Sequence, residues 1–241
     1  GIGEISIYRP LRVAFFSTGD ELRSIGSPLG EGQIYDSNRY TIYGMLVKLG
    51  CEVYDMGVIA DDPTLIENAF ADASKIADVV ITSGGVSVGE ADFVKQMLNK
   101  LGEVLFWKIA MKPGRPMAYG KIGNAHFFGL PGNPVAVMVT FYQFVREALL
   151  VLMGRTSIDP IPTLKVLCTS PIKKVPGRTE FQRGILSQDA NGVWMVKVTG
   201  DQGSGILKSM SDANCFIVLQ QAQGNIEAGA MVDVQLFEGV T

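Results

Sequence analysis

A glycine-rich loop followed by acidic residues is the part of this chain with the clearest chemical character. Residues 79–82 form a short apolar run that is typical of a buried strand, and a helical pattern begins at Asp92. The segment between them contains Gly84, Gly85 and Ser87. Glycines let the backbone approach an anion, and free N–H groups at a helix start point towards it. The segment therefore predicts either a phosphate-binding loop or a plain tight turn between a strand and a helix.

The acids beside this loop favour a site that also holds a cation. Glu90 and Asp92 would repel a bare phosphate, and a bridging cation removes that repulsion. Two other expected strands also end in acids, with Glu21 after the first and Asp61 after the second. Ligands bind at the carboxyl ends of strands in parallel sheets. We therefore expect acids from these three strand ends to share a divalent cation at one edge; a polar turn, and a helix cap for one of Asp61 and Asp62, are the alternative interpretations.

A basic loop supplies the opposite charge. Lys108, Lys112 and Arg115 follow a further expected strand. The sequence Pro-Gly-Arg-Pro at residues 113–116 excludes a regular helix, so we expect a rigid loop. Three cations on a rigid loop suit a multiply charged oxyanion, whereas a solvated basic loop is the alternative.

Two more segments could complete such a site. The turn Gly-Leu-Pro-Gly-Asn-Pro at residues 129–134 opens a long helix, and Pro131 and Pro134 stiffen it. The start of that helix adds a positive end for an anion. Arg183 and Ser204, in the second half of the chain, could reach a ligand or could be ordinary surface and hairpin residues.

Composition argues against several other kinds of site. The single histidine, His126, makes a multi-histidine metal site impossible within this chain and is typical of a packed strand residue. The three cysteines are scattered, which indicates free thiols in a reducing, cytoplasmic compartment. A net charge of −3 argues against nucleic-acid binding. Charged residues interrupt the apolar stretch at 135–153, so we expect a buried helix and no membrane span.

The elements that must position these residues form two domains. In residues 1–154, apolar strands alternate with helical patterns, one of them capped at 36–38, which predicts a three-layer α/β/α fold with a mostly parallel sheet. Residues 155–162 contain two prolines and indicate a linker. Short alternating runs at 163–241 predict a small all-β, barrel-like domain of about five or six strands. Because the chain begins Gly-Ile-Gly without a methionine, we also expect an N-terminal portion to be missing.

Four motifs, taken in order, carry a family resemblance. Residues 17–22, 84–92, 112–116 and 129–134 resemble those of the molybdopterin molybdenumtransferase family, which includes MoeA and the gephyrin E-domain. The resemblance implies that residues 1–154 form the molybdopterin-binding domain and that the family's C-terminal β domain follows. It also implies that two N-terminal domains are absent, and that one of these completes the active cleft from the other subunit of a homodimer.

The resemblance implies an enzyme that inserts molybdenum from molybdate into adenylylated molybdopterin, releases AMP and uses Mg²⁺. The implied functional acids, and Mg²⁺ ligands, are Glu21, Asp61 and Asp92. The positions implied to meet molybdate or another anionic ligand are Lys108, Lys112, Arg183 and Ser204. The remaining positions implied to bind or shape the substrate site are Thr18, Gly84, Gly85, Ser87, Arg115, Pro131 and Pro134. Arg115 stands where the family often has lysine, which keeps the charge but changes the donor geometry.

Two other functions stay open, and both follow from the same resemblance. One is the related adenylyltransferase step, against which the β domain and the basic loop argue. The other is a non-catalytic, gephyrin-like scaffold, against which the intact set of acids and cations argues. Contact with the adenylylating enzyme is a further expectation.

Overall fold

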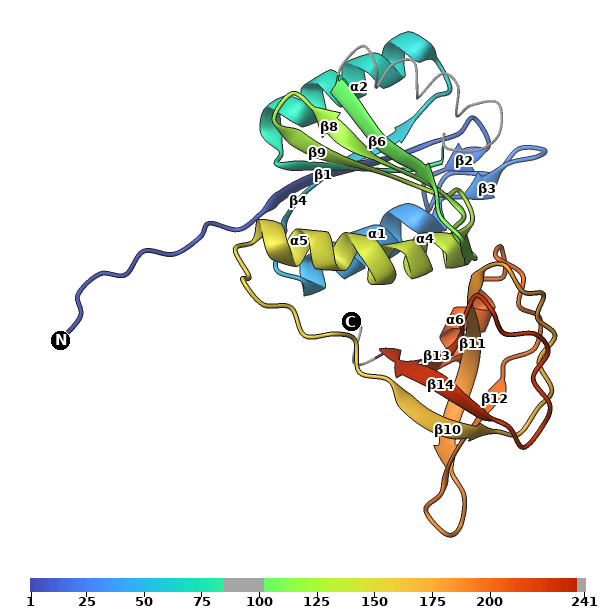
Figure 1. Cartoon of the computed structure of the whole chain (residues 1–241). Coiled ribbons are helices and arrows are strands. Elements are labelled where there is room, and N and C mark those ends of the chain that lie inside the picture. The colour runs from blue at the N-terminus through green and yellow to red at the C-terminus, as the bar shows by residue number, and fades with distance from the viewer. Residues whose placement is uncertain (85–101, 238–241) are drawn as a thin grey trace.

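The structure is a computed structural model that describes residues 1–84 and 102–237, with the side chains of 104–107 left aside. Four residues of the expected phosphate and cation site lie outside the described residues: Gly85, Ser87, Glu90 and Asp92. The described chain forms an α/β domain and a β-barrel, joined by an extended segment (Figure 1). The chain before β1 forms an N-terminal arm that extends away from the α/β domain (Figure 1), and Arg9, near the base of the arm, pairs with Asp78.

A six-stranded sheet forms the middle of the α/β domain, in the order β4-β1-β5-β9-β8-β6 (Figure 1). The strand bounds are Glu52–Ile59 (β4), Arg12–Thr18 (β1), Val79–Ser83 (β5), Ala125–Leu130 (β9), Pro116–Ile122 (β8) and Gly102–Lys108 (β6). The first four are parallel, whereas β8 is antiparallel to both β9 and β6. This confirms the mostly parallel sheet, and it places the carboxyl ends of β4, β1, β5 and β9 along one edge.

Helices cover both faces of this sheet. Helix α1 (Ser37–Lys48) and the long helix after β9 lie on one face, and α2 (Pro63–Ile76) lies on the other (Figure 1). Successive strand residues point to opposite faces, so Val13 of β1 packs in the core with α1, whereas Ala14 packs in the core with α2. Asp62 caps the start of α2, because its side chain accepts hydrogen bonds from two backbone N–H groups of the first turn.

The long helix contains α4 (Pro134–Thr140), a π-helical turn (Phe141–Val145) and α5 (Arg146–Leu152). By length and composition alone it could cross a membrane, and it is the one such helix among the described residues. Its inward face is fully buried at Val137, Val145 and Leu149, which belong to the largest hydrophobic core. It therefore packs as a core helix, as the sequence predicts.

The second domain is a closed five-stranded barrel, which confirms the barrel-like prediction. Its strands are β10 (Leu164–Cys168), β11 (Thr179–Gln188), β12 (Trp194–Val198), β13 (Cys215–Leu219) and β14 (Met231–Leu236). Their order is β12-β10-β14-β13-β11, and β12 also pairs with β11, which closes the barrel. The short helix α6 (Lys208–Asp212) lies between β12 and β13 in the chain.

Three short strands differ from the sequence prediction. Strands β2 (Leu22–Arg23) and β3 (Ile34–Tyr35) form a small separate pair. Strand β7 (Met111–Lys112) lies inside the segment expected to be a rigid loop, and it pairs in parallel with β11 at the edge of the barrel. A piece of the first domain's chain therefore joins the sheet of the second domain, which fixes the basic loop against the barrel.

Candidate functional site

A cleft of about 510 Å³ lies between the two domains. Its polar and loop residues from the α/β domain are Lys112, Pro113, Gly114, Arg115, Pro131 and Asn133. Those from the barrel side are Arg178, Glu180, Gln182, Arg183, Asp201, Gln202, Gly203 and Ser204. Four of these side chains are cationic and two are acidic, so the cleft suits an anionic ligand.

Lys112 is held at the cleft by the barrel. It is the strand partner of Glu180 across the β7–β11 pair. Its Nζ lies 3.6 Å from Oε2 of Glu180, whose side chain is buried. Gly114 follows with a φ of 95°, and a Cβ there would lie 2.5 Å from Cγ2 of Thr140 in α4. The loop after Lys112 is therefore packed closely against the long helix, and an alanine at 114 would not fit.

Arg183 is a buried cation at the back of the cleft, with 1% of its surface exposed. Its Nε donates to Oγ of Ser209 (3.0 Å) and its Nη2 donates to the carbonyl of Gly203 (3.1 Å). Its Nη1 donates no hydrogen bond within the described part of the chain. Burial lowers the pKa of Arg183 to about 10, while the charge of Asp201 opposes this, so the group stays cationic at neutral pH. A buried cation with a spare donor favours an anionic partner.

Ser204 lies on the barrel loop that meets the start of α4. Its carbonyl accepts a hydrogen bond from the N–H of Val135 (3.1 Å). One of the helix-start donors expected to serve an anion is therefore used by the barrel. Pro131 lines the cleft, whereas Pro134 is the first residue of α4 and shapes the turn from outside the lining.

Lys108 lines a different cavity, of about 410 Å³, together with Arg115 and Arg178. The sequence places Lys108 and Lys112 on one basic loop. In the structure their side chains face neighbouring cavities that share Arg115 and Arg178. Arg178 is a cation that the sequence analysis did not select.

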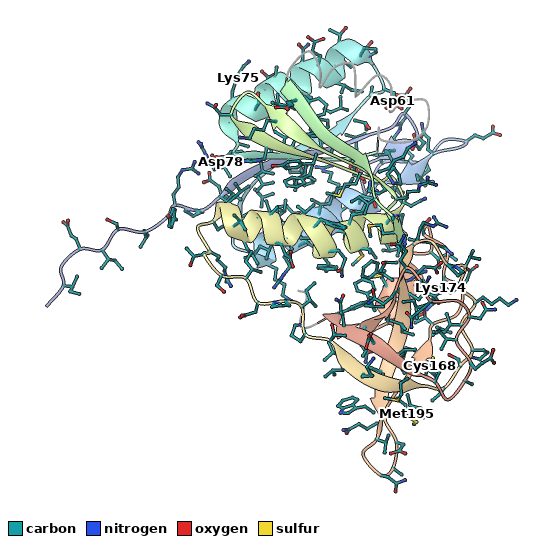
Figure 2. The ribbon with its side chains drawn as sticks, in the orientation of Figure 1. Asp61, Lys75, Asp78, Cys168, Lys174 and Met195 are labelled. Atoms are coloured by element: carbon teal, nitrogen blue, oxygen red, sulfur yellow. The ribbon has the colours of Figure 1, made fainter. Side chains whose placement is uncertain are left out.

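Acids from two strand ends come together at the carboxyl edge of the sheet. The N–H of Asp20 donates to Oδ2 of Asp61 (3.2 Å), and the N–H of Asp61 donates to Oδ1 of Asp20 (3.1 Å). Burial raises the pKa of Asp61, and the charges of Asp20 and Glu21 add to the rise, while the hydrogen bond from Asp20 opposes it. Figure 2 shows Asp61 at the opposite end of the sheet from Asp78. Asp20 is a member of this group that the sequence analysis did not select.

These acids fit a cation only in part. The described residues contain no group of three His, Cys, Asp or Glu side chains that could hold a metal ion. The third expected ligand, Asp92, lies outside them. Mg²⁺ is usually bound through one or two carboxylates together with substrate phosphate and water. Within residues 1–84 and 102–237, Asp61 and its neighbours therefore form no closed protein cage and suit a cation that arrives with a phosphate.

The glycine loop begins against the end of β1. Gly84 has a φ of 88°, and a Cβ there would lie 2.5 Å from the carbonyl oxygen of Thr18 and 3.1 Å from its Oγ1. Only glycine fits this position. A Cβ on Gly132, in the proline-rich turn before α4, would lie 3.9 Å from Cα of Gly84. The glycine loop and the proline-rich turn, which are distant in the sequence, are therefore neighbours in space.

Asn38 ties these two loops together. Its Nδ2 donates to Oγ of Ser83 (2.8 Å) and to the carbonyl of Gly132 (2.7 Å). From the sequence, Asn38 is predicted only as part of a helix cap, and nothing local to it indicates these two contacts. Four buried side-chain atoms at this edge have no hydrogen-bond partner in the described structure: Ser17 Oγ, Thr18 Oγ1, Asp36 Oδ2 and Asn38 Oδ1. Unpaired buried polar groups are costly, so this edge favours a polar ligand.

The other sequence candidates lie away from the cleft. His126 is partly buried in β9, with its Nδ1 2.8 Å from the Tyr119 hydroxyl. Burial lowers the pKa of His126, and the charge of Lys121 adds to this. The three cysteines are free, as predicted. His126 is therefore a packed strand residue, as the sequence indicates.

Comparison with known proteins supports the same interpretation of both domains. Residues 14–151 match the family described as a probable molybdopterin binding domain, and residues 165–237 match the MoeA C-terminal region (domain IV). The molybdopterin molybdenumtransferase of Haemophilus influenzae is 49% identical over 98% of this chain and 59% of its own length. The gephyrin of Dictyostelium discoideum is 34% identical over 91% of this chain and 35% of its own length.

Solved structures agree with these relatives. Two structures of the molybdopterin biosynthesis MoeA protein from Pyrococcus horikoshii align with TM-scores of 0.80 and 0.76, at 32% and 26% identity. Each alignment covers 95% of this chain and 55% or 54% of the other. The chain thus spans roughly a third to three fifths of the relatives it matches. It belongs to the family of molybdopterin-binding domains and carries the MoeA C-terminal domain behind it.

Proposed function

We propose that this chain provides the pterin- and oxyanion-binding part of a molybdopterin molybdenumtransferase. The reaction would insert molybdenum from molybdate into adenylylated molybdopterin and release AMP. The observation that carries the proposal is the cationic cleft between the domains, which combines Lys112 of the α/β domain with Arg183 of the barrel. Relatives with the name molybdopterin molybdenumtransferase are similar to this chain over nearly all of its length.

Molybdate would bind in this cleft. It is a small dianion, and a small dianion needs several converging donors. Lys112, the spare Nη1 of Arg183 and the loop at Ser204 supply such donors from two domains. Arg115 and Arg178 continue the positive charge into the cavity that Lys108 lines, which would attract anions towards the cleft.

The phosphates of the substrate would bind at the carboxyl edge of the α/β sheet. Gly84 and the buried hydroxyl of Thr18 lie there, next to the acids Asp20 and Asp61. Mg²⁺ held by Asp61, its neighbours and the phosphates would neutralise charge on the departing phosphate. Burial raises the pKa of Asp61, and repulsion by Asp20 and Glu21 adds to the rise. A cation would relieve that repulsion, which supports the assignment.

The alternatives differ in what they need from the barrel. An adenylyltransferase-like step would use the sheet edge and leave the cationic cleft without a purpose. A gephyrin-like scaffold would need neither the sheet edge nor the cationic cleft. We therefore keep the insertion step as the proposal, carried out in the cytoplasm by a full-length homodimer in which another domain completes the cleft. Contact with the adenylylating enzyme would supply the substrate.

The test is molybdate binding to the purified chain, measured by isothermal titration calorimetry. Lys112→Ala should weaken binding about tenfold to a hundredfold, because a charged hydrogen bond contributes about 1.5–3 kcal/mol. Lys165→Ala is the matched control, since Lys165 is an exposed barrel lysine that pairs with Asp233 outside the cleft. Binding of molybdopterin should change little in either variant. Equal molybdate affinity in both variants would contradict the placement of the anion.

A further inference from the structure

Glu180 is an unexpected group in a cleft for anions. Its side chain lines the cleft with only 2% of its surface exposed. Oε2 faces Nζ of Lys112 at 3.6 Å and accepts a hydrogen bond from Nε2 of Gln182 (3.1 Å). Oε1 accepts no hydrogen bond within the part of the chain that the structure describes. A nearly buried carboxylate therefore offers one spare acceptor oxygen beside the lysine that would hold the oxyanion.

The other charged groups near Glu180 do not remove the repulsion between its carboxylate and a bound oxyanion. The charged groups that line the cleft with it are Lys112 on β7, Arg115 on the loop after β7, Arg178 and Arg183 at β11, and Asp201 after β12. The nearby Lys174 is turned to other partners, since its Nζ donates to the backbone carbonyl of Gln223. A dianion on Lys112 would lie within a few ångströms of an ionised carboxylate. Two anionic groups that share a site cannot both stay fully ionised without cost.

We infer that Glu180 couples oxyanion binding to the uptake of one proton and so selects the oxyanion by its basicity. One proton from solvent enters with the dianion and is shared between Oε1 of Glu180 and an oxygen of the anion. The resulting O–H···O⁻ hydrogen bond is of the strong, charge-assisted kind. The proton offsets one of the negative charges shared by Glu180 and the anion, and no bond between the central atom of the anion and its oxygens is broken.

This coupling gives the cleft a way to distinguish molybdate from sulfate. The two ions have the same charge and the same tetrahedral geometry, with molybdate the larger, so the charge of the cationic donors does not distinguish them. Sulfate is a much weaker base than molybdate, so it shares a proton with a carboxylate far less readily. The carboxylate then repels sulfate and binds molybdate through the shared proton. The inference rests on the proposed function, because it needs the oxyanion at Lys112.

A positioning function for Glu180 makes a different prediction. If the carboxylate only held Lys112 in place, its removal would weaken all oxyanions by the same factor and leave proton uptake unchanged. The ratio of molybdate to sulfate affinity and the number of protons taken up therefore separate the two explanations.

The experiment is calorimetric titration of the 241-residue chain with molybdate and with sulfate. Proton uptake comes from repeating each titration in two buffers of different ionisation enthalpy. In wild-type protein we expect about one proton per molybdate, and an affinity that falls up to about tenfold for each rise of one pH unit. In Glu180→Gln we expect no proton uptake and a molybdate-to-sulfate ratio reduced about tenfold or more, which is about 1.4 kcal/mol. Glu227→Gln, an exposed barrel residue, is the control and should behave as wild type.

Each outcome decides between these explanations. A Glu180→Gln protein that keeps its proton uptake and its anion ratio would refute the inference but leave the cleft assignment intact. Wild-type binding of molybdate without proton uptake would refute it as well, and that measurement needs no variant. If wild-type protein bound neither anion, the proposed function would fail together with the inference.

Discussion

Asn38 offers the strongest test of how the two loops at the sheet edge are held. Its Nδ2 donates to Ser83 at the end of β5 and to Gly132 before α4, at 2.8 and 2.7 Å. Both contacts are at least partly buried. Asn38→Ala would remove both donors at once and leave the two acceptors without them. We therefore expect the substitution to loosen the junction between the glycine loop and the proline-rich turn.

The magnitude follows from the hydrogen bonds. Each buried partner left unpaired costs about 1–3 kcal/mol, so the loss is about 2–6 kcal/mol. Oδ1 of Asn38 is itself buried without a partner, and its removal returns about 1–3 kcal/mol. The net destabilisation should be about 2 kcal/mol. At about 2–4 °C per kcal/mol, the unfolding midpoint should fall by about 4–8 °C.

The assay is thermal and urea unfolding followed by circular dichroism. Asn191→Ala is the control, because Asn191 is an exposed residue in the hairpin between β11 and β12, and a surface change of this kind alters stability by about 0.5 kcal/mol or less. If Asn38→Ala and Asn191→Ala unfolded at the same temperature and urea concentration, Asn38 would not hold the loops. The reasoning from its two hydrogen bonds would then be wrong.

Two further predictions concern carboxylates at opposite ends of the sheet. Burial and the charges of Asp20 and Glu21 raise the pKa of Asp61, so ionisation of Asp61 destabilises the folded state as the pH rises towards and through the folded pKa. Asp61→Asn should therefore raise the unfolding midpoint at pH 7 in the absence of divalent cations, and it should abolish any stabilisation by Mg²⁺ added together with phosphate. A lower midpoint in the variant would contradict this. The Arg9 side chain holds the pKa of Asp78 well below 3.8, so this pair stabilises the fold above about pH 4 and stops doing so as the pH falls through the folded pKa. Asp78→Asn should reduce the loss of stability on acidification. Because the Arg9–Asp78 pair holds the N-terminal arm to the α/β domain, the substitution should also speed proteolysis of the arm at pH 7. An unchanged cleavage rate would show that this pair does not hold the arm.

The main elements of the fold could be predicted because burial leaves a periodic trace in the sequence. Strand β5 is buried along its whole length and reads as a short apolar run, and α2 has an apolar stripe with a proline at its start. Strands β10, β12 and β14 of the barrel alternate between buried and more exposed residues, whereas β11 and β13 are buried over most of their length. Strand β7 could not be predicted, because two residues carry no period and their pairing depends on β11, nearly seventy residues later.

Part of the lining of the candidate cleft was predictable from residue types alone. Lys112, Arg115, Arg183 and Ser204 line one cleft, as a basic loop and a second domain suggest. Glu180 was not selected, because an acid on an expected strand gives no sign that its partner is a lysine from another domain. Asn38, similarly, satisfies a helix-cap pattern, and only the folded chain shows its contacts with Ser83 and Gly132. Residues whose function comes from distant partners leave no local pattern.

The cleft depends on both domains, because each domain supplies part of its lining and positions residues of the other. Lys112 comes from the α/β domain, but its backbone pairs with a barrel strand and its amine faces the barrel's Glu180. The start of α4 gives its Val135 N–H to the barrel loop at Ser204. Neither domain alone could therefore hold these donors in position. An α/β domain without the barrel would keep the sheet edge at Gly84 but lose half of the lining of the cationic cleft. Under the proposed function, the barrel is therefore the part that would add oxyanion binding to pterin binding.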